Sequence, residues 1–149
     1  MKKYAGYINL RPINGVIYPS SLQNIVMKDY VSNKLNSIFY LSPTEILQAK
    51  YSVTLNTLIS KETKVNGIVM LSTFSLPKNK VTRMNVLKQA TKEKKEIHFI
   101  LDEKIFRTLK DLNEIEDQVL FNNKFFTATK TNLNSLEKLI TKKNKISFV

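Results

Sequence analysis

Short apolar runs alternate along this chain with longer segments whose apolar residues recur at helical spacing. We expect strands over four of these runs, at residues 3–10, 37–41, 68–71 and 97–101. We expect helices between them, from about residue 20 to residues 33–36, from 43 to about 61, and from about 79 to 95. Strands and helices that alternate in this way, with right-handed crossovers, predict an α/β fold: a three-layer α/β/α arrangement around a mainly parallel sheet.

The segment Ile68-Val69-Met70-Leu71 is apolar at every position, which is typical of a central parallel strand covered by helices on both faces. The pattern after residue 106 is less regular. We expect a helix that follows Asp111, a short extra strand over 125–128 that would make a fifth, and a final helix over 134–143. A chain of 149 residues is the size of one domain, so we expect a core over 3–106 and a helical extension over 107–149.

Composition excludes several classes of site. The chain has no Cys and one His, so it offers no disulfide, no thiol nucleophile and no His/Cys metal cluster, and we expect no metal. No apolar run approaches the ~18 residues of a membrane span, and we expect a soluble, cytoplasmic protein. The net charge of +12 comes almost entirely from Lys, with arginines only at 11, 83 and 107. A solvated basic face and a nucleic-acid footprint both remain open.

Ligands of open α/β sheets bind beyond the carboxyl ends of the strands, so the residues that follow each expected strand are candidates for a site. By position these are Tyr7 and Arg11, then Ser42 and Glu45, then Ser72, Thr73 and Ser75, and finally Asp102 and Glu103. The glycine-rich fingerprints of dinucleotide-binding and P-loop proteins and the G-x-S-x-G elbow are missing. We therefore expect no cofactor of those kinds.

A scattered set of residues resembles one known family. The set comprises Gly6-Tyr7, Arg11-Pro12, Gln23, Lys28-Asp29-Tyr30, Glu45, Gly67-Ile68, Ser72, Leu76-Pro77, Arg83, His98-Phe99 and Asp102. Over about residues 4–106 this pattern resembles the sporadic carbohydrate cluster proteins, which are small bacterial proteins encoded among surface-polysaccharide genes. The resemblance implies a role in making or modifying a surface glycan. Asp102 then Glu103 follow the His-Phe strand where that family favours Glu, and Lys28 stands where Arg is usual.

A fainter resemblance is to the amino-terminal catalytic domain of serine recombinases, which begins with a strand of the type G-Y-x-R-x-S. It implies a resolvase-like or flavodoxin-like fold. Here Asn9 stands where the arginine belongs and Arg11 where the nucleophilic serine belongs, while Phe74-Ser75 replaces an Asp-Arg pair. Without that serine and arginine, strand transfer on DNA has no chemistry to use. We expect the fold to be retained and the activity to be absent.

Each candidate residue has a structural and a functional interpretation. Candidates for acid–base work are Glu45, His98 and Asp102, and candidates for ligand contact are Tyr7, Arg11, Gln23, Asp29, Tyr30 and Ser72. A guanidinium at the mouth of the first strand suits phosphate or carboxylate, which makes Arg11 the first residue to mutate. The structural alternatives are core roles for the tyrosines and His98, the first turn of a helix for Glu45, an ion pair with Arg11 or Lys28 for Asp29, and a cap for Gln23.

Two hypotheses follow. In the first, the chain binds or acts on a sugar or nucleotide-sugar, and Tyr7, Arg11 and His98 converge in a polar cleft. In the second, it is a non-catalytic interaction or nucleic-acid-associated protein that uses its basic surface. The basic residues of that surface would be Lys78, Lys80, Arg83, Lys88 and Lys92. The sequence leaves open whether the chain is an enzyme and whether it forms a homo-oligomer through its long first loop.

Overall fold

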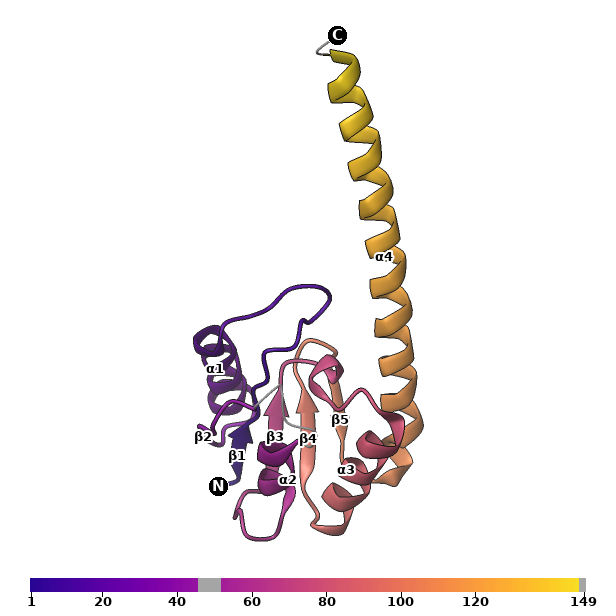
Figure 1. Cartoon of the computed structure of the whole chain (residues 1–149). Coiled ribbons are helices and arrows are strands. Elements are labelled where there is room, and N and C mark those ends of the chain that lie inside the picture. Colours follow the sequence, from indigo (N-terminus) through magenta and orange to yellow (C-terminus); the bar gives the residue numbers. More distant parts are fainter. Residues whose placement is uncertain (46–51, 148–149) are drawn as a thin grey trace.

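The computed structural model describes the backbone of residues 1–45 and 52–147, and the side chains within these ranges other than 126–133, 136 and 141–147. Its strands are β1 Lys3–Gly6, β2 Ile38–Tyr40, β3 Gly67–Met70, β4 Glu96–Phe99 and β5 Lys104–Phe106. They form one sheet in the order β2-β1-β3-β4-β5 (Figure 1). β1 to β4 are parallel and β5 pairs antiparallel with β4, which confirms a mainly parallel α/β sheet.

Helices cover both faces of this sheet. They are α1 Ser20–Asp29, α2 Val53–Ile59, α3 Lys80–Lys92 and α4 Leu112–Ser147. α1 continues into a π-helical turn, η1 Tyr30–Lys34, and two 3-10 turns, η2 Thr73–Ser75 and η3 Leu109–Asp111, precede α3 and α4. α1 packs on one face, while α2 and α3 pack on the other, so the domain has the three layers that the alternation predicts.

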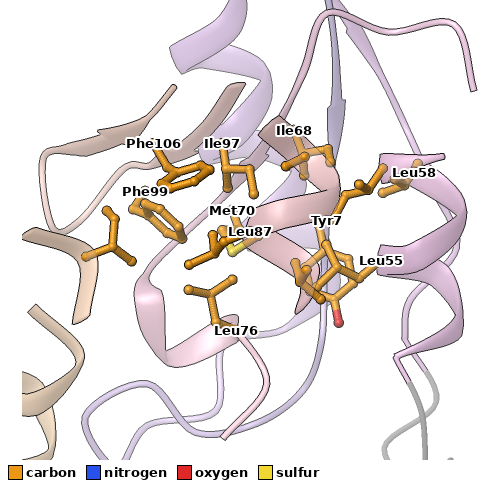
Figure 2. Packing of buried hydrophobic residues seen from close by; sticks show 14 of the residues in the cluster. Tyr7, Leu55, Leu58, Ile68, Met70, Leu76, Leu87, Ile97, Phe99 and Phe106 are labelled. Carbon is orange, nitrogen blue, oxygen red and sulfur yellow. The ribbon is translucent and has the colours of Figure 1, made fainter. Parts of the chain in front are cut away.

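Successive strand residues point to opposite faces, and each face therefore has its own core. Tyr7, Ile68 and Met70 pack against α2 and α3, and Figure 2 shows this cluster from close by. The intervening residues Ile8 and Val69 pack against α1. Every residue of β3 is buried, as expected for a central parallel strand.

Four expectations about the elements need correction. The first strand ends at Gly6 instead of residue 10, because the chain beyond it leaves the ladder to form the carboxyl edge. Ser42 to Glu45 are not helical, and α2 begins at Val53, with residues 46–51 outside the described residues. The fifth strand is β5, because the chain turns back at Glu103, where φ is 53°, and pairs with β4.

The carboxyl-terminal extension is the fourth correction. Residues 125–128 are not a strand, and α4 is one helix of 36 residues that replaces the two expected. The strand propensity of a Phe-Phe-Thr run is weak compared with continuing a helix that already packs on the domain. The buried side chain of Ile115 anchors its first turns in the core, and the rest of the helix extends away from the sheet (Figure 1).

Candidate functional site

Tyr7 and Glu45 meet in the interior beyond the carboxyl end of β1. The Tyr7 hydroxyl donates to Glu45 Oε2 at 2.9 Å. The same carboxylate accepts from the backbone N–H groups of Thr54 and Leu55, both at 3.1 Å, so it caps the first turn of α2. Glu45 therefore stabilises the first turn of a helix, which is the structural alternative considered for it. That helix begins at Val53, however, and not near Glu45 itself.

Burial raises the pKa of the Tyr7 hydroxyl well above its usual range, and the neighbouring Glu45 charge acts in the same direction. The side chain of Asn9 and the charge of Arg11 oppose that rise in pKa. Tyr7 is therefore a neutral hydrogen-bond donor in this site.

Asn9 lies at the centre of a cluster of four polar residues beyond the carboxyl end of β1. Asn9 Nδ2 donates to the Ser75 carbonyl at 2.7 Å, and Arg11 Nη2 donates to the same carbonyl at 3.0 Å. The backbone N–H of Arg11 donates to Asn9 Oδ1 at 3.2 Å. Gln23 Nε2, from α1, donates to the carbonyls of Asn9 and Tyr18 at 3.2 and 2.9 Å. We name Asn9, Arg11, Gln23 and Ser75 the Asn9 cluster.

Two buried polar atoms of the Asn9 cluster, Ser75 Oγ and Gln23 Oε1, have no hydrogen-bond partner among the described residues. Both residues are 1% exposed. The two carbonyls that accept from Gln23 Nε2 fix the orientation of the amide, so its oxygen cannot exchange places with its nitrogen. An unsatisfied buried polar group costs roughly 1–3 kcal/mol. Within the described residues, the cluster thus contains one unpaired acceptor, one unpaired hydroxyl and a half-buried guanidinium.

Ser72 and Asp102 form a brace between the carboxyl ends of β3 and β4. Ser72 Oγ lies 3.1 Å from each carboxylate oxygen of Asp102, and the backbone N–H of Thr73 donates to Asp102 Oδ2 at 2.7 Å. Ser72 Oγ also accepts from the backbone N–H of Phe74 at 3.3 Å. The side chains of Ser72 and Asp102 therefore stabilise the η2 turn.

His98 lies in a second polar network, on the α1 face of the sheet. Its Nε2 is 2.9 Å from Glu96 Oε2 and its Nδ1 is 2.9 Å from the Tyr30 hydroxyl. The Tyr4 hydroxyl donates to Glu96 Oε2 at 3.0 Å. We name Tyr4, Tyr30, Glu96 and His98 the His98 network. Burial lowers the pKa of His98, and the hydrogen bond and charge of Glu96 oppose that shift.

The sequence hypothesis placed Tyr7, Arg11 and His98 in one cleft, but the structure separates them. Tyr7 belongs to the core cluster of α2 and α3, whereas His98 contacts Tyr30 at the end of α1, on the other face. Asp29 is exposed at the end of α1, where it accepts from Asn33 Nδ2 at 2.6 Å. The structure therefore brings Tyr7, Arg11, Gln23 and Glu45 to the carboxyl edge and places Tyr30, His98 and Asp29 elsewhere.

A cavity of about 730 Å³ lies beside the Asn9 cluster, between the 12–16 loop, the segment 73–78 and α4. Its lining residues are Pro12, Asn14, Gly15, Val16, Thr73, Phe74, Leu76, Pro77, Lys78, Arg83, Val119, Asn122 and Asn123. Asn122 Nδ2 donates to Thr73 Oγ1 at 2.7 Å, which ties α4 to the η2 turn.

Arg83, on α3, joins two walls of this cavity, the 73–78 segment and α4. Its Nε and Nη2 each donate to the Glu116 carboxylate of α4 at 2.7 Å, and its Nη1 donates to the carbonyls of Pro77 and Lys78. The paired guanidinium lowers the pKa of Glu116. Arg83 is 5% exposed, so it is not part of the exposed basic surface that the second hypothesis requires.

Sequence reasoning missed Asn9 as a site residue and named Ser75 only by its position after a strand. Asn9 interrupts an otherwise apolar run at the end of a strand, and this polar residue was the feature of the sequence that could have indicated the site.

Among the described residues no group of three or more His, Cys, Asp or Glu side chains could hold a metal ion, and no helix is long and apolar enough to cross a membrane.

Comparison with known proteins finds similarity in structure alone. No family model matches the chain, and no curated protein matches it. The crystal structure of the N-terminal catalytic domain of TP901-1 integrase superposes with a TM-score of 0.58 at 16% identity, covering 91% of this chain and 99% of that chain. The chain has a resolvase-like fold. At this identity, the match establishes the architecture of this resolvase-like domain and not its activity.

Proposed function

We propose that this chain is a small α/β protein of surface-glycan assembly that binds a sugar or nucleotide-linked sugar at the carboxyl edge of β1. The observation that carries the proposal is the Asn9 cluster, in which Ser75 Oγ and Gln23 Oε1 have no partner among the described residues and the Arg11 guanidinium donates to the Ser75 carbonyl. A sugar hydroxyl both donates and accepts, so it can satisfy Gln23 Oε1 and Ser75 Oγ. A phosphate or carboxylate on the same ligand suits the guanidinium.

The proposal concerns binding, because the carboxylates nearest this edge are already engaged. Glu45 holds two backbone N–H groups and a phenol, and Asp102 holds the η2 turn. The glycan context comes from the resemblance of residues 4–106 to the sporadic carbohydrate cluster proteins. A recombinase activity is not proposed, because Arg11 occupies the place that the sequence comparison gives to the serine nucleophile.

The test is calorimetric titration of the full chain with glucose 1-phosphate and UDP-glucose. A charge-assisted hydrogen bond is worth roughly 1.5–3 kcal/mol, so Arg11→Ala should weaken binding by at least about tenfold. Arg107→Ala is the matched control, since it removes an exposed arginine whose Nε lies 3.7 Å from Glu96, in the His98 network. Failure of both probes to bind, or equal losses in the two variants, would overturn the proposal.

A second candidate, nucleic-acid association, is favoured by exposed lysines on and before α3. Lys78, Lys80, Lys88 and Lys92 are all exposed, and the fold is that of an integrase catalytic domain. Binding to duplex DNA through these lysines should weaken steeply as salt rises. Fluorescence anisotropy at low salt with the double variant Lys80→Glu/Lys88→Glu tests this candidate, and a flat wild-type titration would exclude it.

A further inference from the structure

We propose that the cavity between the 12–16 loop, the η2 turn and α4 binds the nucleoside part of a nucleotide-linked sugar. This inference rests on the proposed function, and it assigns each part of the ligand to a place in the structure. Gln23 and Ser75 of the Asn9 cluster bind the sugar, Arg11 of the same cluster binds the phosphate, and the cavity binds the base. A volume of about 730 Å³ lies within the roughly 300–1,000 Å³ of pockets that hold ligands of nucleotide size.

The cavity and the Asn9 cluster share two chain segments. Pro12 lines the cavity and directly follows Arg11, while Phe74 and Leu76 line it on either side of Ser75. Consecutive Cα atoms lie about 3.8 Å apart, so the backbones of Arg11 and Ser75 directly adjoin residues of the cavity lining. A ligand whose sugar contacts Ser75 and whose phosphate contacts Arg11 therefore has its next group directed along this wall.

The lining suits a flat aromatic group better than a second sugar. Phe74 is half-buried, with part of its side chain against the core of the α1 face, and it also lines the cavity between Pro12 and Pro77. Stacking on an aromatic side chain is tolerant of base identity because every base has a π-face. Val119 of α4 also lines the cavity, so the 73–78 segment and α4 both contribute apolar residues to the lining.

Exposed polar residues of the lining can contact the edge of a base and the phosphate. Asn14, which lies in the left-handed region at φ 52°, and Lys78 both line the cavity and are exposed. Asn122 is already engaged, with Thr73 Oγ1 through its nitrogen and with Gln118 through its oxygen. Together with the Arg83–Glu116 pair, these bonds hold the cavity in a preformed shape before a ligand enters.

The experiment compares four kinds of probe on the full chain by calorimetry: nucleoside monophosphates, UDP-glucose, glucose 1-phosphate and an oligothymidylate. Removing an aromatic ring on which a base stacks weakens binding, so Phe74→Ala should weaken the binding of nucleoside monophosphates and UDP-glucose by about tenfold. Glucose 1-phosphate should bind the variant as well as it binds the wild type. Phe125→Ala, which removes an exposed Phe of α4 outside the cavity lining, should change nothing.

Phe74→Leu keeps an apolar side chain without a ring and should repeat the selective loss if Phe74→Ala folds poorly. If glucose 1-phosphate binds but no nucleoside monophosphate does, or if the Phe74 variants bind nucleotides like the wild type, the inference fails while the proposed function stands. If no probe binds, both fail. Tighter binding of oligothymidylate than of UDP-glucose would assign the cavity to nucleic acid and overturn the inference.

Discussion

The domain contains two buried polar groupings that differ in how completely they are satisfied. In the His98 network, both nitrogens of the imidazole, the Tyr30 hydroxyl and the Tyr4 hydroxyl each have a partner within 3.0 Å. In the Asn9 cluster, on the carboxyl side of β1, Ser75 Oγ and Gln23 Oε1 have none among the described residues. From the sequence we selected Tyr30 and His98 of the first grouping and Arg11 and Gln23 of the second as candidate site residues.

On our proposal, the difference separates polar groups that hold the fold from polar groups that bind a ligand. A fully paired network offers an incoming molecule nothing without first losing one of its own bonds. An unpaired buried group lowers stability, and in a native protein such a group is explained by an ordered water, an ion, a ligand or a catalytic role. Truncation should therefore cost stability in the His98 network and affinity in the Asn9 cluster.

The largest effect is expected for His98→Ala. The change removes a buried ring and leaves the Tyr30 hydroxyl and the Glu96 carboxylate each without one partner. Loss of packing and of two bonds should lower the free energy of unfolding by about 3 kcal/mol. Urea denaturation measures this free energy, and the affinity for glucose 1-phosphate should not change.

The control is Asp29→Ala, at an exposed site, whose free energy of unfolding should stay within about 0.5 kcal/mol of the wild-type value. A stable His98→Ala variant that has lost binding would reverse our assignment.

A smaller effect is expected from the titration of His98. Burial lowers the pKa of His98 from 6.5, so the unfolded chain binds a proton more readily than the folded one. The contribution of His98 to stability is therefore complete above about pH 6.5 and is lost as the pH falls through the folded-state pKa. Within that window the free energy of unfolding should change by up to about 1.4 kcal/mol per pH unit.

The chain has one His, and the pKa values of Glu96 and Glu116 lie below 4.5, so the region from about pH 6.5 to 5 isolates His98. His98→Asn should flatten the slope there. Urea unfolding at several pH values is the measurement, and an unchanged slope in the variant would contradict the assignment.

The smallest effect on stability is expected for Ser75→Ala. This change removes a buried hydroxyl that has no partner among the described residues, so the free energy of unfolding should stay constant or rise by up to about 1 kcal/mol. Binding of glucose 1-phosphate should weaken. Ser72→Ala is the matched variant, because its hydroxyl contacts Asp102, and it should lose about 1 kcal/mol. Equal losses of stability in both variants would contradict the unpaired state of Ser75 Oγ.

Much of the architecture could be predicted from the sequence, because its determinants are local. The apolar segment 68–71 and the helical spacing around it place β3 at the centre of a parallel sheet. β5 could not be predicted, since three residues after a tight turn carry no periodic pattern and pair with β4 only through the tertiary structure. The continuity of α4 was obscured by strand-forming residues at 125–128.

The candidate site was less predictable, because the sequence indicates which strand end a residue follows and not which face it occupies. Arg11 and Gln23 were selected and do meet, through Asn9. His98 was selected as well, but it follows the alternation of β4 onto the α1 face. Whether a buried oxygen finds a partner depends on side chains from three separate segments, and no local pattern encodes that.

The single long helix α4 belongs to two cooperative units. Its first turns carry buried residues such as Ile115 and open only when the domain unfolds. Its 36 residues span roughly 54 Å, and the far end extends beyond the sheet (Figure 1). An isolated helix is only marginally stable in water. Backbone amides near residue 115 should therefore exchange hydrogen at the rate of global unfolding, whereas those near the far end exchange through local opening.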